Sequence, residues 1–318
     1  MAAAAMVVGA GCAENKQADK EMKELIILHA GSLSVPFRDV SRAFNELYPN
    51  VTIKAEAAGS RDTARKVSDL GRSCDVLGSA DYVVIDNLLI PDHAAYSIQF
   101  ATNEMIIAYT DRSTHADRID SHNWPEVLLS EGVLVGRSDP NRDPCGYRTV
   151  MVFQLSERHY KTPGLEEKLT ERAGPKYIRP KETDLLALLE SGEIDYLFIY
   201  RSVAEQHGLR IVTLPDEVNL KSTAFADHYG QATIEVTGKR PGEMITRTGA
   251  PMVYGVTIPH NCENRDLAKA WVELLLSETG RAIMERNGQP AVAPARTAQF
   301  DRLPERLKPY CTKAGDDG

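Results

Sequence analysis

The sequence predicts an α/β fold organised around parallel strands. Its first part repeats one unit three times, in which a short apolar run is followed by a small polar turn and then by apolar residues at helical spacing. The three apolar runs lie at 25–30, 51–55 and 74–77. Such a repeat is typical of a parallel sheet covered by helices. Ligands of these sheets bind at the carboxyl ends of the strands, so the turns are candidate binding positions.

The remaining strands and helices are predicted from the same two patterns, apolar runs and helical spacing. Apolar runs bounded by Gly, Pro or Asn predict strands, and apolar residues three or four positions apart predict helices. Further strands are expected at 100–109, 133–135, 177–178, 196–200, 211–214 and 251–258. Helices are expected at 36–48, 62–70, 81–89, 124–129, 149–155, 165–173, 183–191, 203–207, 268–276 and 280–287. The segment 223–249 combines glycines with an alternating stretch, which predicts a surface hairpin or flap.

The length and composition predict a two-lobe globular protein. The chain has 318 residues, which is more than one hydrophobic core usually spans. Hydrophobic residues make up 42% of the chain and charged residues 26%, as in ordinary globular proteins. The net charge of -8 and the absence of a Lys/Arg run argue against a nucleic-acid partner. No apolar stretch reaches the roughly 20 residues that a membrane span needs.

The two ends of the chain differ from its middle. Residues 1–11 are small and apolar and precede Cys12, which resembles the end of an export signal with a lipid-attachment cysteine. A basic start is missing, so residues 1–23 are interpreted as a truncated signal and lipoprotein tether; the alternative is a frayed N-terminus. Lipidation would leave the rest of the chain extracytoplasmic and anchored to the cell membrane. Residues 301–318 are predicted to be a loose polar tail.

The other cysteines do not indicate a metal cluster or a redox motif, because no CxxC spacing occurs. An exported chain could pair some of them, but the sequence does not define which. They are Cys74, Cys145, Cys262 and Cys311.

The loop at 136–147 is the first candidate for an anion-binding site. It leads from a short apolar run into a predicted helix and contains two prolines and two glycines. The helix N-terminus behind it offers free N–H groups and partial positive charge, which favour an anion. Asp143 lies near this helix start and is either a helix cap or a ligand contact. Glu182 lies at another predicted helix start, where the alternative role is a favourable charge–dipole contact.

Two serines occupy turns of the predicted sheet, each beside a glycine. Ser32 follows the first strand and Ser60 follows the second. A serine at a helix start is most often only a cap. Two such serines at the same edge of one sheet nevertheless favour a shared role in ligand binding.

Taken together, the turns resemble those of the extracytoplasmic solute-binding proteins of ABC importers, and in particular the archaeal-type branch of the molybdate/tungstate-binding family. The similar segments occur in family order over most of 25–294, although the stretch between 160 and 177 is shorter than in relatives. The segments are 29–33, 58–60 with 64–65, 79–81, 138–148, 179–184 and 198–200.

The resemblance implies a two-lobe periplasmic-binding-protein fold of type II, with the ligand in a cleft between the lobes. The chain is expected to cross between the lobes twice, in two crossover strands at 100–109 and 251–258. Lobe one would comprise 24–104 plus 253–300, and lobe two 105–252. The lobes would close on the ligand by a hinge motion.

The resemblance also implies roles for six residues. An oxyanion would be bound by the hydroxyls and neighbouring amides of Ser32 and Ser60, by the backbone N–H of Cys145 and by Tyr200. Two carboxylates would reach the metal itself; these are Asp143 and Glu182. Hexavalent tungsten and molybdenum are hard centres that prefer oxygen ligands, and they can expand from four to six oxygens. Sulfate and phosphate cannot, and a carboxylate would only repel them.

The expected function is therefore capture of tungstate or molybdate and its delivery to an ABC permease, with no cofactor besides the ligand. Two alternatives remain open at this point. The same fold could bind another solute, such as sulfate, phosphate or a metal cation. Less favoured is an enzyme in which the two carboxylates act as an acid–base pair or bind a divalent cation, since no nucleophile motif or histidine spacing accompanies them.

Overall fold

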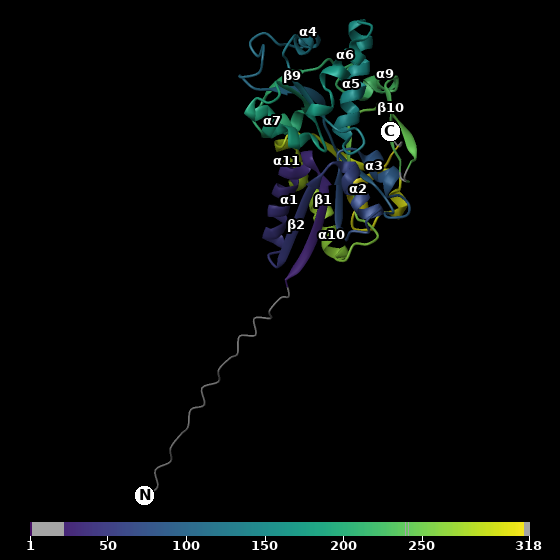
Figure 1. Cartoon of the computed structure of the whole chain (residues 1–318). Coiled ribbons are helices and arrows are strands. Elements are labelled where there is room, and N and C mark those ends of the chain that lie inside the picture. The colour runs from purple at the N-terminus through teal and green to yellow at the C-terminus, as the bar shows by residue number, and fades with distance from the viewer. Residues whose placement is uncertain (2–21, 239, 241, 315–318) are drawn as a thin grey trace.

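The computed structural model describes residue 1 and residues 22–314, except 239 and 241. Two sheets organise these residues, and each forms the centre of one lobe (Figure 1). The first lobe contains a seven-stranded sheet in the order β14-β13-β4-β12-β3-β1-β2. The second lobe contains a five-stranded sheet in the order β7-β6-β8-β5-β9. The predicted α/β class and two-sheet architecture are thus confirmed.

The first sheet begins as the repeat predicted. Strand β1 (Lys23–Ala30) pairs in parallel with β2 (Val51–Ala58) and β3 (Val76–Ser79). Two of the connecting helices are α1 (Ser34–Leu47) and α2 (Ser60–Ser68). The sheet is not parallel throughout, because β12 pairs in antiparallel fashion with both β3 and β4. The parallel pairing predicted for the opening of the chain is therefore confirmed for β1, β2 and β3, and the later strands make the sheet mixed.

The apolar run predicted as one strand at 100–109 is two strands in different sheets. Strand β4 (Ile98–Thr102) belongs to the first sheet and β5 (Met105–Tyr109) to the second. The chain returns to the first sheet in β12 (Val253–Thr257). Both passages between the lobes lie within the predicted segments.

The second lobe holds the remaining strands and the central helices. Its sheet contains β5 with β6 (Val135–Ser138), β7 (Ile178–Arg179), β8 (Tyr196–Tyr200) and β9 (Arg210–Thr213). Strands β10 (Thr233–Thr237) and β11 (Met244–Thr248) form a separate antiparallel hairpin, as predicted for 223–249. The helices are α4 (Trp124–Leu129), α5 (Pro144–Tyr160), α6 (Leu165–Arg172), α7 (Leu186–Ser191), α8 (Arg201–Gln206) and α9 (Ala226–Tyr229).

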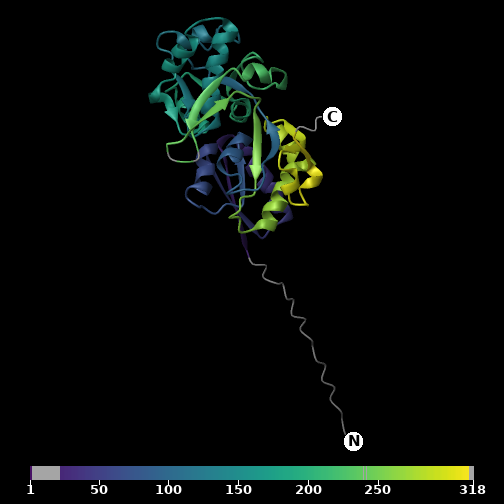
Figure 2. The same cartoon turned by 90° about the vertical axis from the view of Figure 1, so that its right-hand side faces the viewer.

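The prediction of a loose tail from residue 301 is wrong for the described residues. Strand β14 (Cys311–Lys313) pairs with β13 (Ala291–Thr297) at the edge of the first sheet. Leu303 and Leu307 are buried, so the few apolar residues of this polar stretch suffice to attach it. Figure 2 shows this C-terminal part in yellow against the first lobe. The other helices of this lobe are α3 (Tyr82–Leu88), α10 (Arg265–Leu276) and α11 (Glu278–Arg286).

Among the described residues, no helix combines the length and the apolar character that crossing a membrane requires. The proposed lipid-attachment residue, Cys12, lies outside the described part of the chain.

Candidate functional site

The six residues predicted to contact a ligand come together where the two lobes meet. Each is at most 1% exposed. The first lobe contributes two serines at the starts of helical turns, and the second lobe contributes the end of β8 and the starts of α5 and of a short 3-10 turn. The residues are Ser32, Ser60, Asp143, Cys145, Glu182 and Tyr200.

The lobes are in direct contact around these residues. The backbone N–H of Arg61 in the first lobe donates to the carbonyl of Arg142 in the second, at 3.1 Å. Gly31 lies so close to the second lobe that a Cβ there would be 2.9 Å from Thr183 Oγ1 and 3.1 Å from Glu182 Oε1. A side chain at position 31 would therefore push the lobes apart, and this glycine is required by the close approach.

Asp143 caps two helical segments at once. It is the N-cap of α5, and its Oδ1 accepts a hydrogen bond from the backbone N–H of Cys145 at 3.3 Å. Its Oδ2 accepts from the backbone N–H of Glu182, which opens a short 3-10 turn (Glu182–Leu185), at 3.0 Å. The helix predicted at 149–155 thus begins five residues earlier, because Pro144 suits its first turn. The capping interpretation of Asp143 is confirmed, and its carboxylate also joins the two loops of the second lobe.

Glu182 differs from Asp143 because its carboxylate has no hydrogen-bond partner among the described residues. Both of its oxygens are buried, and neither accepts a hydrogen bond from any residue that the structure describes. Burial and the nearby negative charge of Asp143 raise the pKa of Glu182 well above its usual range. Burial likewise raises the pKa of Asp143. The pair therefore retains a proton at pH values where two exposed carboxyls would both be ionised.

Two hydroxyls of the site donate to no acceptor within the described residues. Ser60 Oγ accepts from the backbone N–H of Ala80 at 3.0 Å. Tyr200 Oη accepts from Arg148 Nη1 at 3.0 Å. Neither donor can act as an acceptor, so each hydroxyl proton remains available to a ligand oxygen.

Arg148 is a site component to which the sequence pattern assigned no role. Arg148 is 3% exposed, and its guanidinium reaches across the lobe boundary from α5. Besides Tyr200, it donates to the carbonyl of Ala80 at 2.7 Å and lies 3.6 Å from Asp81 Oδ2. Asp81 also accepts from Tyr147. Arg148 lies in the segment 138–148 that carried the resemblance, but only the fold reveals that it bridges the lobes.

The described residues contain no group of three or more His, Cys, Asp or Glu side chains arranged to hold a metal ion. The four cysteines of the described chain are free thiols. Burial raises the pKa of Cys145 far above its ordinary value, so its side chain is a neutral thiol.

Comparison with known proteins defines the family. The sequence profile of bacterial extracellular solute-binding proteins matches residues 25–289. The chain belongs to this family. Its members bind solutes and are not enzymes, so the chain is a solute-binding protein of ABC transport and the enzyme alternative is not supported.

Individual relatives agree with this assignment. An uncharacterised solute-binding protein of Petrotoga mobilis is 51% identical over 92% of each chain. The molybdate/tungstate-binding protein WtpA of Thermococcus kodakarensis is 40% identical over 95% of this chain and 92% of its own length. WtpA of Pyrococcus abyssi is 42% identical over 94% and 92%.

Solved structures support the type II fold of this solute-binding protein. The periplasmic molybdate-binding protein of Azotobacter vinelandii matches with a TM-score of 0.58 at 16% identity, covering 83% of this chain and 98% of its own. The sulfate-binding protein SubI of Mycobacterium tuberculosis matches with a TM-score of 0.61 at 13% identity, covering 92% and 94%. Because these proteins bind different anions, the likeness establishes the fold and not the ligand.

Proposed function

We propose that this solute-binding protein captures tungstate or molybdate outside the cytoplasm and delivers it to an ABC permease. The observation that carries the proposal is the meeting of two buried carboxyl groups with two hydroxyls whose protons are free. A site with only hydroxyls and amides would suit any oxyanion. The carboxyl groups of Asp143 and Glu182 restrict the ligand to an oxyanion whose central atom can bind further oxygens.

The chemistry of the metal explains why carboxylates would be tolerated beside a dianion. Two carboxylate oxygens added to four oxo groups complete a distorted octahedron around hexavalent tungsten or molybdenum. Glu182 supports this role because its oxygens have no partner among the described residues. For sulfate or phosphate, the same carboxylates would add a repulsion of roughly 1–4 kcal/mol per charge pair at 4 Å.

The oxo groups would be bound by Ser32, Ser60 and Tyr200 and by the amide of Cys145. That amide now donates to Asp143 over a long distance, 3.3 Å, and would turn to the ligand when Asp143 bonds the metal. A metal cation is the weaker alternative, since Ser60 and Tyr200 would direct their protons toward it.

The proposal extends to the location of the protein. Lipidation at Cys12 would attach the chain to the outer face of the cell membrane, near the permease. Labelling with a radioactive fatty acid in a lipoprotein-processing host tests this part, and a Cys12→Ala variant that is labelled equally would contradict it.

Titration calorimetry with tungstate, molybdate, sulfate and phosphate tests the ligand. We expect tungstate and molybdate to bind, and tungstate binding to persist in millimolar sulfate. Tight binding of sulfate, with tungstate no better, would overturn the proposal.

A further inference from the structure

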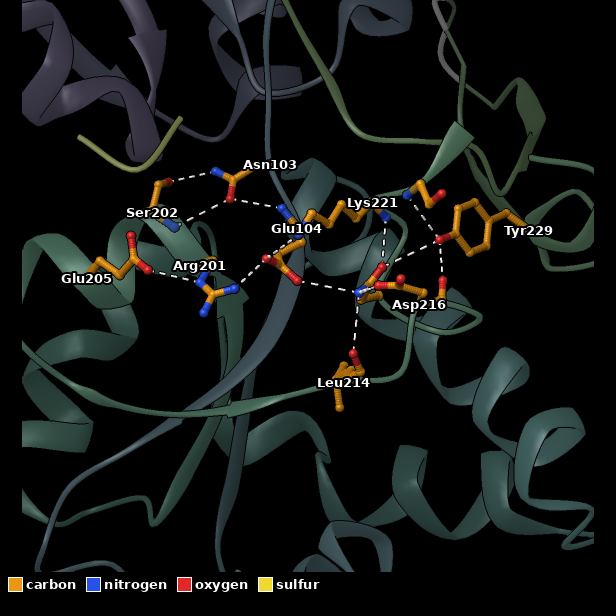
Figure 3. Close-up of polar contacts among 11 residues, drawn as sticks. Asn103, Glu104, Arg201, Ser202, Glu205, Leu214, Asp216, Lys221 and Tyr229 are labelled. Carbon is orange, nitrogen blue, oxygen red and sulfur yellow. Dashed lines mark hydrogen bonds and ion pairs between the residues drawn. The ribbon is translucent and has the colours of Figure 1, made fainter. Parts of the chain in front are cut away.

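A buried asparagine lies where the chain first passes between the lobes. Asn103 follows β4, precedes β5 and is 4% exposed. Figure 3 shows its side chain beside Ser202 at the start of α8. All of its hydrogen-bonding capacity is used. The Oδ1 atom accepts from the backbone N–H groups of Glu104 at 2.9 Å and Ser202 at 3.4 Å, and Nδ2 donates to Ser202 Oγ at 2.6 Å and Tyr254 Oη at 2.8 Å.

The backbone determines the orientation of this amide. Backbone N–H groups only donate, so the side of Asn103 that faces Glu104 and Ser202 must be its oxygen. In a flipped amide, the NH2 group of Asn103 would face the backbone N–H groups of Glu104 and Ser202, and no acceptor would lie between them. The nitrogen therefore faces Tyr254, and the hydroxyl oxygen of Tyr254 must accept from it.

The orientation of the Asn103 amide also fixes the direction of the hydrogen bond between Tyr254 and Ser32, a residue of the candidate ligand site. Tyr254 Oη lies 3.1 Å from Ser32 Oγ. Burial raises the pKa of Tyr254 to about 12, so the phenol keeps its proton. Since its oxygen already accepts from Asn103, Tyr254 directs that proton to Ser32 Oγ. The proton of Ser32 must then point away from Tyr254.

We infer that Asn103 is a positioning residue, which fixes Ser32 as a hydrogen-bond donor to the bound anion without touching that anion. The inference rests on the proposed function, in which Ser32 contacts an oxyanion. It adds that the donor character of Ser32 is imposed from the segment connecting the lobes. Ser32 thereby matches Ser60 and Tyr200, whose protons are freed by a backbone amide and by Arg148.

An ion cluster at the same passage holds Asn103 in place. The carboxylate of Glu104, which is 4% exposed, pairs with Arg201 at 2.7 Å and with Lys221 at 3.3 Å (Figure 3). The backbone N–H of Arg201 donates to the carbonyl of Glu104 at 3.0 Å. These contacts tie the segment after β4 to α8, so the two amides that orient Asn103 stay together.

The test reverses the hydrogen-bond direction with an isosteric change. In Asn103→Asp, the two backbone amides still bind one oxygen and keep the carboxylate ionised at pH 8.5. The other oxygen can only accept, so Tyr254 turns its proton to it and Ser32 must donate to Tyr254. We expect tungstate affinity, measured by calorimetry on the full chain, to fall at least tenfold, which corresponds to about 1.4 kcal/mol.

A double-mutant cycle separates this mechanism from simple repulsion by the added charge. In a Ser32→Ala background, Asn103→Asp should weaken tungstate binding by no more than about twofold, because the donor is already absent. Equal weakening in both backgrounds, or none in the otherwise native chain, overturns the inference. Tyr254→Phe is the matched control: it leaves the proton of Ser32 free, so its effect should be smaller than that of Asn103→Asp.

Two measurements keep the outcomes distinct. Thermal unfolding of each ligand-free variant shows whether Asn103→Asp is folded. If it is not, Asn103→Ala replaces it, because alanine removes the donor to Tyr254. We then expect tungstate affinity to fall in the otherwise native chain and to stay unchanged in the Ser32→Ala background; an unchanged affinity in the otherwise native chain contradicts the inference. If the native chain binds no tungstate or molybdate, the proposed function itself has failed. If it binds and only the cycle fails, the role of Asn103 alone is rejected.

Discussion

The two sides of the candidate site differ in how their polar groups are satisfied. On the first-lobe side, Ser60 accepts from Ala80 and Ser32 contacts Tyr254. On the second-lobe side, Glu182 is buried beside Asp143 with no partner among the described residues. The hydroxyl groups of the first side are therefore held in place before any ligand arrives. On the second side, the buried carboxyl group of Glu182 is energetically unfavourable, and a bound ligand can relieve this cost. Under the proposed function, we expect affinity to depend on both lobes and selectivity and pH dependence to come from the second.

The largest effect is expected from the cation that joins the two sides. Replacing Arg148 by Met leaves Asp81, Ala80 and Tyr200 without their shared donor. Loss of one partner from a buried ion pair costs about 3–5 kcal/mol. We expect the free energy of unfolding to fall by that amount in chemical denaturation. A loss below about 1 kcal/mol would mean that the lobe contact does not depend on Arg148.

The carboxylate side should dominate affinity and selectivity. For Asp143→Ala and for Glu182→Ala, we expect tungstate affinity to fall about 100-fold, equivalent to about 2.7 kcal/mol, with less discrimination against sulfate. Calorimetry with both anions measures this. Unchanged affinity in both variants would end the carboxylate proposal. Glu167→Ala, exposed on α6, is the control for a generic loss of charge.

The pH dependence of stability should also come from the carboxylate side. The pKa values of Asp143 and Glu182 are raised in the folded protein, so the folded state binds more protons than the unfolded chain. Ligand-free stability should therefore fall as pH rises above the ordinary carboxyl pKa of about 4.3, by at most about 1.4 kcal/mol per pH unit for each group.

Thermal unfolding between pH 4 and pH 8 checks this sign. Glu182→Gln removes the titrating group and should flatten the dependence, and tungstate should reverse it in the native chain by bonding the ionised pair. Two results together would contradict the raised pKa values of Asp143 and Glu182: a ligand-free stability that increases with pH over this range, and the same pH dependence in Glu182→Gln.

The smallest effect is expected on the first-lobe side. Ser60→Ala removes one donor to the anion and should weaken tungstate and sulfate binding by about tenfold each, in line with one hydrogen bond to a charged group. The ratio of the two affinities should stay unchanged, because this side does not distinguish the anions. A change in the ratio after Ser60→Ala would remove the distinction drawn between the two sides.

Most of the architecture could be predicted from the sequence. The strand–turn–helix repeat, both passages between the sheets and the hairpin follow from local periodicity and from glycine and proline positions. The six candidate residues could be named because they lie in turns similar to those of a known family. Boundaries were less certain: α5 begins at Pro144, and the run at 100–109 contains two strands separated by Asn103 and Glu104.

Three features were not accessible in this way. The stretch after residue 301 packs on the first sheet through a few apolar residues that local composition conceals. Arg148 acquires its role from Ala80 and Asp81, which are more than 60 positions away in the chain. The hydrogen-bond direction from Asn103 to Ser32 needs Tyr254, which reaches both only after the second passage between the lobes.

The sequence by itself determined which elements form and which turns carry hydroxyl, amide and carboxyl groups, because those properties depend on neighbouring residues. Only the tertiary structure decided that Glu182 would be buried beside Asp143 with no hydrogen-bond partner in the described part of the chain, and which way each hydroxyl proton points. Burial, pKa and hydrogen-bond direction depend on groups that the fold brings together from distant parts of the chain, and no local pattern encodes them.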